Sequence, residues 1–410
     1  VADEYARRIN GYLGPNGIGT DHIIALHKLG YVPLRFCALP EGTLCPLRVP
    51  MFTVESTHPE FAWLVNYFET ILSNVVWMPC TSATTAYRMR TILDEAAKLT
   101  GGDPDFVPWQ GHDFSFRGMA GVEAAMLSGA GHLLSFTGTD SIPAIDLIER
   151  YYPGDNGLIG GSVPATEHSV MCAGGQESEL ETFERLLDLY PTGVVSIVSD
   201  TWNLWSVLTD ILPLLKERIM DRDGTLVIRP DSGDPVKIVC GDDSKEGPPR
   251  KGAIELLWDV FGGTTTATGH RKLDRHVGCI YGDAINYERC HAICDGLAAK
   301  GFASTNLVYG IGSYSYQFVT RDTYGFAMKA TWVDRGGNGV DLLKTPVTDD
   351  GEKFSAKGRL AVIRENGRLA LLNSASDEDE ARSELCPVWE NGRFLRMWSF
   401  GACRRALRPC

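Results

Sequence analysis

Short apolar runs that end abruptly in polar, glycine-containing loops recur along the chain from about Trp109 onward. Each run is long enough for one strand, and the loops that follow contain Asp, Arg, Ser and Gly. The runs occupy residues 133–136, 194–198, 226–228, 277–280 and 306–308. Residue types that bind ligands and react therefore gather where the predicted strands end.

Amphipathic segments long enough for helices lie between these runs, at residues 179–190, 202–218 and 287–300. The repeating unit is strand, loop, helix. This order predicts an α/β fold with a parallel α/β barrel, whose site is built at the C-terminal face from the loops that follow the strands. A doubly wound open sheet is the alternative, but neither a Gly-x-Gly-x-x-Gly motif nor a P-loop follows any of the predicted strands.

The two ends of the chain differ in character from this repeating part. Residues 34–50 are Pro-rich and strand-like, residues 60–75 are helix-like, and short strands are predicted again within 360–372. We therefore predict a barrel catalytic domain over 106–330. A flanking α+β subdomain is expected to combine an N-terminal part, 1–105, with a C-terminal part, 331–410.

Composition narrows the class of protein. The 410 residues are 44% hydrophobic and 22% charged, as in ordinary globular proteins. The net charge of −13 argues against a nucleic-acid partner. No apolar run approaches the roughly 18 to 20 residues that a membrane-spanning helix needs. No export signal is readable and the 11 cysteines include no Cys-x-x-Cys pair, so we expect reduced thiols and a cytoplasmic protein.

One cluster, Cys290, His291 and Cys294, could hold a metal, because the two thiols share a helix face at a spacing of four. Structural zinc needs four ligands, and no second pair lies at zinc-finger spacing. An ordinary helix is therefore the favoured interpretation of this segment.

Two polar loops have the residues for phosphate and sugar chemistry. Within 161–169, Glu167 precedes His168, and a histidine beside a carboxylate can act as acid, base or nucleophile. The loop Arg229-Pro-Asp231-Ser-Gly233 can bind phosphate through its Arg and amides, while Asp231 holds ribose hydroxyls or Mg²⁺. The alternatives are a surface histidine with an incidental acidic neighbour and a capped turn.

Further loops add to this picture. The segments 309–313 and 320–322 supply Gly312, Ser313 and Arg321, as a phosphate cradle would, although Gly-x-Gly alone is a weak signal. Phe114 precedes Arg117 by three residues, which suits a flat heteroaromatic ring beside a phosphate, although Phe114 and Phe116 could simply share one face of a strand. Together the loops favour a phosphorylated-sugar site with a divalent cation.

Seven motifs, in order along the chain, carry a resemblance to a known family. They lie at residues 112–118, 138–140, 162–169, 198–200, 228–233, 282–283 and 320–322. In these motifs the chain resembles the nicotinamide phosphoribosyltransferase family. Members of this family are dimeric type II phosphoribosyltransferases. The resemblance implies transfer of phosphoribosyl from phosphoribosyl pyrophosphate to nicotinamide, for pyridine nucleotide salvage in NAD biosynthesis.

The resemblance also implies roles in substrate binding. Phe114 would stack on the nicotinamide ring, with Asp140 accepting from the carboxamide and Arg229 donating to it. The nucleotide phosphate would be held by Arg117 and, from the second protomer of a homodimer, by Arg321 and Lys329. The ribose hydroxyls would bind Asp231, Gly282 and Asp283. Mg²⁺ and pyrophosphate would be organised by Asp200 and Asp231.

ATP is the implied co-substrate. His168 corresponds to a histidine that ATP phosphorylates transiently, with Glu167 beside it, and Lys344 and Lys353 would reach the ATP phosphates. Where many members have three glycines, this chain has Gly312-Ser313-Tyr314, which bears on the diphosphate or ATP contacts. In the family a further N-terminal segment contributes a tyrosine that closes the nicotinamide site, so we expect activity to depend on such a segment.

Two other functions compete with this interpretation. A nicotinate phosphoribosyltransferase would share the fold and the phosphate chemistry but take a ring with a carboxylate. A non-catalytic ligand-binding relative would retain the fold without the reaction.

Overall fold

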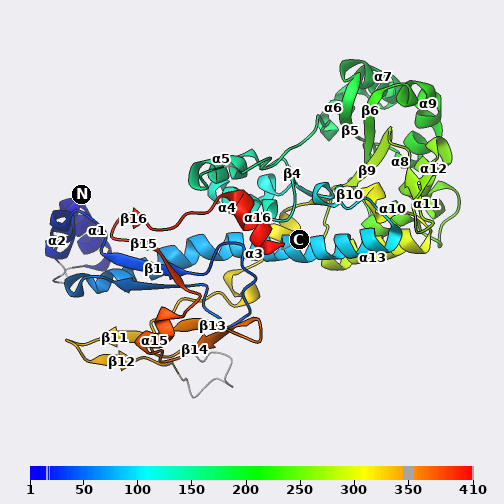
Figure 1. Ribbon diagram of the computed structural model, residues 1–410. Coiled ribbons are helices and arrows are strands. Elements are labelled where there is room, and N and C mark those ends of the chain that lie inside the picture. Colours follow the sequence, from blue (N-terminus) through cyan, green and yellow to red (C-terminus); the bar gives the residue numbers. More distant parts are fainter. Residues whose placement is uncertain (15–16, 18, 155, 345–354, 409–410) are drawn as a thin grey trace. The chain divides into compact units, whose positions relative to one another are not determined.

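The computed structural model describes residues 1–14, 17, 19–154, 156–344 and 355–408 (Figure 1). The chain forms two compact units. The first comprises Val1–Trp77, Tyr152–Asn156 and Tyr324–Cys410, and the second comprises Met78–Tyr151 and Gly157–Thr323. Helix α3 (Trp63–Thr100) runs through the division at Trp77, so residues 78–105 belong with the second unit.

A six-stranded parallel sheet forms the centre of the second unit, in the order β4-β3-β10-β9-β6-β5. Its strands are β3 (Gly111–Asp113), β4 (Gly138–Thr139), β5 (Thr192–Val198), β6 (Asp223–Arg229), β9 (Val277–Tyr281) and β10 (Leu307–Ile311). The long strands are apolar where the sheet is covered, and the last four residues of β5 are buried. Such continuous burial is typical of parallel strands with helices outside them.

Residues 161–166 join the two edges of this sheet. At the β4 edge, Gly161 N donates to Thr137 O over 2.9 Å and Thr139 N donates to Gly161 O over 3.0 Å. At the β5 edge, Ser196 N donates to Pro164 O over 2.9 Å and Thr166 N donates to Ser196 O over 3.0 Å. The curled sheet is thereby closed, which confirms the predicted parallel α/β barrel class.

Helices connect the strands of the barrel. They are α4 (Val122–Leu133), α5 (Ile142–Tyr151), α6 (His168–Gly174), α7 (Glu179–Leu189), α8 (Leu204–Ser206), α9 (Leu212–Met220), α10 (Pro235–Cys240), α11 (Pro248–Lys251), α12 (Ala253–Phe261), α13 (Tyr287–Ala299) and α14 (Ser313–Tyr316). Helix α7 buries Phe183, Leu186 and Leu187, at the spacing of one helix face. A short hairpin of β7 (Gly263–Thr265) and β8 (Arg271–Leu273) follows α12.

The helices predicted at 179–190, 202–218 and 287–300 are confirmed, the second with a π turn at Val207–Ile211. The strand predicted at 133–136 is wrong. Leu133 ends helix α4, and Ser135 and Phe136 both donate to His132 O as a continued helical turn would. The run is apolar because Leu133 and Phe136 are buried, and the strand is the pair Gly138–Thr139 that follows.

The first unit is built around an antiparallel sheet, in the order β16-β15-β1-β2. Its strands are β1 (Leu34–Ala38), β2 (Phe52–Ser56), β15 (Cys386–Glu390) and β16 (Arg393–Phe394). Arg35 pairs in register with Glu390, and its Nε donates to that carboxylate over 3.0 Å. Strands from the two ends of the chain thus share one sheet. Of the strand-like residues 34–50, only Leu34–Ala38 forms a strand.

Smaller elements complete this unit. They are α1 (Ala2–Leu13), α2 (Asp21–Leu29), the hairpins β11 (Trp332–Asp334) with β12 (Gly339–Asp341) and β13 (Ala361–Glu365) with β14 (Arg368–Leu372), α15 (Asp377–Ala381) and α16 (Phe400–Leu407). The strands predicted within 360–372 are confirmed as β13 and β14. The helix predicted at 60–75 exists but is much longer, because α3 continues to Thr100 through Pro79.

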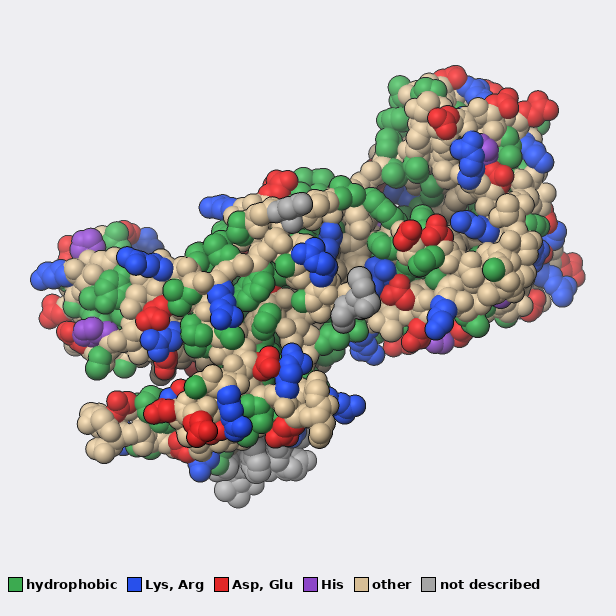
Figure 2. Space-filling view, viewed as in Figure 1, with side chains coloured by type: hydrophobic (Ala, Val, Ile, Leu, Met, Phe, Trp, Pro, Cys, Tyr) green, Lys and Arg blue, Asp and Glu red, His purple; other side chains and the backbone are tan. Residues whose placement is uncertain are grey.

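Among the described residues, no helix combines the length and the apolar character that crossing a membrane requires. On the face drawn in Figure 2, basic side chains stand singly or in small groups among acidic ones. This face therefore offers no broad basic surface to an anionic ligand.

The candidate metal cluster is divided between the core and the surface. Cys290 and Cys294 are buried in α13, whereas His291 is exposed and its Nδ1 lies 2.9 Å from Asp295. Within the described part of the chain, no three His, Cys, Asp or Glu side chains are grouped as metal ligands would be. The two thiols are explained by packing.

Candidate active site

The predicted site residues of the barrel follow its strands directly. Because the strands are parallel, their carboxyl ends meet at one rim of the barrel. Phe114 follows β3, Asp140 follows β4, Asp200 follows β5, Asp231 follows β6, Gly282 follows β9 and Gly312 follows β10. The predicted position of these residues at the ends of strands is confirmed.

The Phe114 ring lies against two glycines. A Cβ at Gly310 would lie 2.5 Å from Phe114 Cδ2, and one at Gly282 would lie 3.3 Å from Cε2. Phe114 N donates to Ile311 O over 3.0 Å, which fixes the backbone behind the ring. A side chain at either position would crowd the Phe114 ring. The glycines at the ends of β9 and β10 therefore allow the ring to pack against the backbone.

Arg229 brings a buried cation to the same place. The residue is 6% exposed, and its Cζ lies 5.9 Å from the centre of the Phe114 ring. Its Nε has no hydrogen-bond partner among the described residues, and its Nη2 lies 4.0 Å from Glu167 Oε2. A buried guanidinium with unused donors favours an acceptor supplied by a ligand.

Asp140 is half-exposed and accepts two hydrogen bonds. His112 Nε2 lies 2.9 Å from its Oδ1, and Ser162 Oγ donates to the same oxygen over 2.5 Å. Partial burial alone would raise the pKa of Asp140, but the hydrogen bond and charge of His112, the Ser162 hydroxyl and the Arg229 charge together lower it. The carboxylate therefore stays ionised.

Asp200 organises the loop that follows β6. Its Oδ2 accepts from Asp231 N over 2.7 Å and from Ser232 Oγ over 2.6 Å. Gly233 adopts a φ of 92°, open mainly to glycine, and its carbonyl accepts from Tyr281 Oη over 2.9 Å. The loop is thus held from β5 and β9 as well as by its own turn.

A second group of charges surrounds Asp231. Burial raises the pKa of Asp231, the Arg229 charge opposes this, and the carboxylates of Asp200 and Asp283 raise it further, so that its pKa lies above the ordinary value. The negative charge of its neighbours makes Asp231 a carboxylate that a cation would stabilise. Asp283 itself is exposed.

His168 begins helix α6 and faces Asp200. Its Nε2 lies 3.4 Å from Asp200 Oδ1, with the imidazole 43% exposed and the carboxylate 5% exposed. Glu167, the residue before it, lies 3.4 Å from Arg117 through Oε1. His168 is therefore oriented by a buried carboxylate and open to solvent on its other side.

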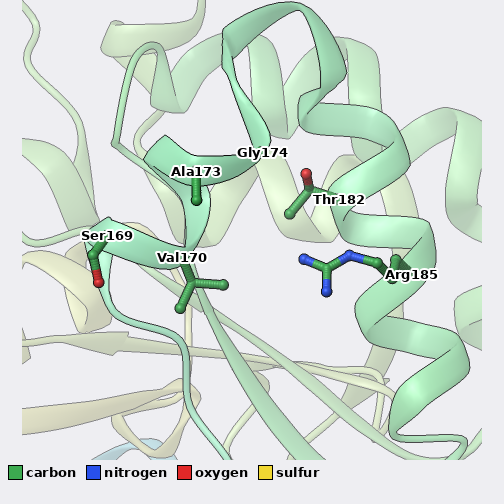
Figure 3. A pocket seen from close by; sticks show the side chains of 6 residues that line it. All are labelled: Ser169, Val170, Ala173, Gly174, Thr182 and Arg185. Carbon is green, nitrogen blue, oxygen red and sulfur yellow. The ribbon is translucent and has the colours of Figure 1, made fainter.

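A shallow hollow of about 530 Å³ lies beyond His168, between α6 and α7. Figure 3 shows Arg185 of α7 reaching toward Val170 of α6. The residues that line it are Ser169, Val170, Ala173, Gly174, Thr182 and Arg185. It contains none of the predicted site residues.

The remaining predicted residues are placed less closely together. A Cβ at Gly118 would overlap Ser313, which puts Ser313 beside the exposed Arg117 loop, while Gly312 is the N-cap of α14. Arg321 is exposed and pairs with Asp322 over 3.2 Å. Lys329 and Lys344 are exposed and belong to the first unit. Lys353 lies outside the described residues.

Comparison with known proteins identifies the family. The sequence pattern of the nicotinate phosphoribosyltransferase (NAPRTase) family matches residues 109–393. The chain belongs to this family. It is 52% identical over 416 residues to the nicotinamide phosphoribosyltransferase of Acinetobacter baylyi, covering 99% of this chain and 82% of the relative.

Two further relatives carry the same name. The nicotinamide phosphoribosyltransferase of Xanthomonas campestris pv. campestris is 36% identical over 387 residues, covering 92% of this chain and 79% of the relative. That of Mycoplasma pneumoniae is 39% identical over 318 residues, covering 76% of this chain and 67% of the relative. The resemblance found in the motifs is confirmed over most of the chain.

His112 and Ser162 are contacts of Asp140 to which the sequence analysis assigned no role, although both stand within motifs of the family. His112 and Phe114 alternate along β3 and beyond, so their side chains face the same way, and their ring centres are 4.8 Å apart. That alternation was a signal for His112. No such alternation points to Ser162, because its position depends on the bridge that Gly161 makes to β4.

Proposed function

We propose that this chain is a nicotinamide phosphoribosyltransferase. The nicotinamide ring nitrogen attacks the anomeric carbon of phosphoribosyl pyrophosphate, the bond from that carbon to the pyrophosphate oxygen breaks, and nicotinamide mononucleotide and pyrophosphate leave. The family is named after nicotinate, but membership of it does not decide whether this chain acts on the acid, nicotinate, or on the amide, nicotinamide. The names of the three relatives support the amide, and so does Asp140.

The observation that carries the proposal is the ionised carboxylate of Asp140. Its lowered pKa keeps it a carboxylate beside His112, whose ring also contacts Phe114. A carboxylate accepts the carboxamide N–H of nicotinamide but repels the carboxylate of nicotinate. Arg229 supports the other half of the amide, since its buried Nε, which has no hydrogen-bond partner among the described residues, suits the carboxamide oxygen.

The barrel rim supplies what the transfer step requires. The transition state resembles an oxocarbenium ion with pyrophosphate departing, so the site must align the ring and neutralise the leaving charge. In this proposal Phe114 would align the ring, Arg117 would bind the nucleotide phosphate, and the ribose hydroxyls would bind Asp231, Gly282 and Asp283. A Cβ at Gly282 would lie 2.6 Å from Asp231 Oδ1, so only glycine leaves the ribose side open.

Mg²⁺ fits the carboxylates at the ends of β5 and β6. Asp200 Oδ1 is buried, makes no hydrogen bond with the described residues and has only the longer contact of 3.4 Å with His168 Nε2, and Asp231 is crowded by negative charge. Asp200 and Asp231 would hold the ion, with the remaining ligands from water and substrate oxygens. When bound, Mg²⁺ would neutralise the negative charge of the departing pyrophosphate.

A product assay tests the proposal. The chain is incubated with phosphoribosyl pyrophosphate and Mg²⁺, and mononucleotide and pyrophosphate are measured with nicotinamide and with nicotinate. We expect product mainly with nicotinamide. Preference for nicotinate would favour the acid-specific enzyme, and binding of nicotinamide mononucleotide without turnover of either base would favour a non-catalytic relative.

We also propose that ATP assists through His168. The imidazole is oriented by Asp200 and open on one side, as a group that accepts and releases a phosphoryl group must be. The γ-phosphoryl would pass from ATP to a ring nitrogen of His168 with ADP as the leaving group, and water would then release it as inorganic phosphate, so that ATP hydrolysis drives the transfer forward. Glu167 lies beside the histidine, and Lys344 and Lys353 are proposed for the ATP phosphates.

His168→Ala is expected to abolish ATP hydrolysis while some transfer from phosphoribosyl pyrophosphate remains, because the histidine is not the glycosyl acceptor. Release of inorganic phosphate and formation of mononucleotide are measured on the same sample. His291→Ala, which removes an exposed histidine paired with Asp295 elsewhere, is the matched control. ATP hydrolysis at the parental rate in His168→Ala would show that the assignment is wrong.

A homodimer with shared sites is a further part of the proposal. Tyr67, Ile71 and Val75 of α3 recur every fourth residue and are exposed, so they form an apolar stripe along one helix face. Such a stripe suits burial against a second copy. Arg321 and Lys329 would then reach the nucleotide phosphate in the partner's barrel.

Mixing two inactive chains tests the sharing of sites. In a dimer of Arg321→Ala with Asp200→Ala, one site carries both changes and the other carries neither. Random exchange is therefore expected to restore about a quarter of the parental activity, since half of the dimers are mixed and each has one intact site. Isolated mixed dimers without any activity would exclude shared sites.

A cytoplasmic location is proposed from the cysteines. The described cysteines are free thiols, and burial raises the pKa of Cys240 and of Cys279 to about 12. Thiols of this kind are unreactive and are typical of a reducing compartment.

A further inference from the structure

The two hydrogen bonds on Asp140 converge on one oxygen. In the described part of the chain, both His112 Nε2 and Ser162 Oγ reach Oδ1. An ionised carboxylate only accepts, so His112 carries a proton on Nε2 and Ser162 directs its hydroxyl hydrogen to Asp140. The second oxygen, Oδ2, is left as the acceptor for a ligand.

The imidazole of His112 is held from two sides. His112 pairs in register with Gly138 of β4, and a Cβ at Gly138 would lie 2.7 Å from His112 Nδ1. The Phe114 ring lies on another side, with ring centres 4.8 Å apart. The residue is 9% exposed. Its position is therefore set by the sheet and by the glycine opposite it.

Ser162 lies in the segment 161–166, which joins the two edges of the barrel sheet. Its neighbour Gly161 forms hydrogen bonds with Thr137 and Thr139 at the β4 edge. Asp140 is the next residue after Thr139, so the donor and the acceptor are fixed by the same bridge. A shift of this segment would move the hydroxyl away from the carboxylate.

We infer that His112 and Ser162 are positioning residues that set the substrate specificity of the site, by occupying Asp140 Oδ1 and presenting Oδ2 to the carboxamide N–H of nicotinamide. This inference rests on the proposed function. It assigns preference for amide over acid to three side chains. Asp140 supplies the charge, and the other two fix its direction and keep the carboxylate from rotating.

The same donors stabilise the charge of Asp140. Both lower its pKa, so removing them raises the pKa and protonates the carboxylate at a higher pH. Nicotinamide binding needs the ionised form. The acid limb of kcat/KM for nicotinamide therefore moves to higher pH when the donors are lost, a change that a merely structural role would not produce.

The test compares Ser162→Ala, His112→Ala, His112→Gln and the double alanine variant. For each, kcat/KM with nicotinamide and with nicotinate is measured across pH. Loss of a hydrogen bond to a charged group weakens binding about tenfold or more, so each alanine change should reduce the nicotinamide preference about tenfold and the double change further. His112→Gln keeps a donor near the position of Nε2 and should restore part of the preference.

Two matched controls remove equivalent pairs outside the site. Ser244→Ala removes a hydroxyl that donates to Asp242 over 2.6 Å, and His276→Gln changes a histidine that lies 2.6 Å from Asp274. Both should keep the parental preference and acid limb. Ser162 is exposed, so Ser162→Ala remains informative if His112→Ala does not fold.

The outcomes separate this inference from the proposed function. A parental chain that makes no nicotinamide mononucleotide contradicts the proposed function itself. A parental chain that prefers nicotinamide, with a preference ratio and an acid limb that stay unchanged in Ser162→Ala and in folded His112 variants, overturns the positioning roles alone.

Discussion

Asp140→Ser is expected to lower nicotinamide turnover and to narrow or reverse the preference for nicotinamide over nicotinate. The carboxylate accepts from the carboxamide but faces the nicotinate carboxylate as a like charge. An unpaired or repelling contact of this kind costs about 2 to 4 kcal/mol, which corresponds to a preference of roughly 30- to 1,000-fold. The measurement is substrate competition, with the fold checked by circular dichroism.

An alternative explanation for Asp140 is capping of the segment that follows it, for which aspartate is well suited. The carboxylate instead accepts from His112 and Ser162. Serine caps almost as well as aspartate, so on the capping explanation the variant would keep the parental preference. Asp242→Ser, which alters a similar Asp and Ser contact outside the site, serves as the control. An unchanged ratio in Asp140→Ser would remove the main physical reason for choosing the amide.

Asp200→Asn is expected to reduce kcat/KM by about 100- to 1,000-fold, the usual effect of removing one group that stabilises charge in a transition state. Asparagine can still accept from Asp231 N or Ser232 Oγ, so the loop persists while the charge is lost. The proposed Mg²⁺ site and the orientation of His168 both depend on that charge. Pyrophosphate release is measured over a range of Mg²⁺ concentrations.

The same loop provides the control for this prediction. Asp234 accepts from Val236 N and Lys237 N as the N-cap of α10. Asparagine caps as well as aspartate, so Asp234→Asn should retain near-parental activity. If Asp200→Asn kept most of its activity with the parental Mg²⁺ dependence, neither the metal role nor the leaving-group role of Asp200 would stand.

The sequence predicted the strand-end residues well where a run of mostly apolar residues lies within one strand. Val194 to Val198 and Leu226 to Ile228 lie within β5 and β6, and Asp200 and Asp231 follow them. The buried C-terminal halves of these two strands are mostly apolar, which is why the runs were readable.

Other features depend on contacts that a sequence pattern does not record. The apolar run at 133–136 serves the end of a helix, and the strand beside it, β4, has only two residues. Residues 161–166 close the barrel through backbone hydrogen bonds without any strand periodicity. Because Ser162 owes its role to that closure, no local signal could have identified it.

The pairing of β3 with β10 has a consequence for how the protein is made. Gly111 lies opposite Tyr309, so the sheet joins residues roughly 200 positions apart, a separation that slows folding. A ribosome adding about 5 to 20 residues per second needs roughly 10 to 40 seconds to synthesise that interval. Until β10 emerges, the partner edge of β3 has no strand to bind. During that time this edge of β3 stays unpaired and open to association with other chains, and slower translation of the middle of the gene prolongs that exposure.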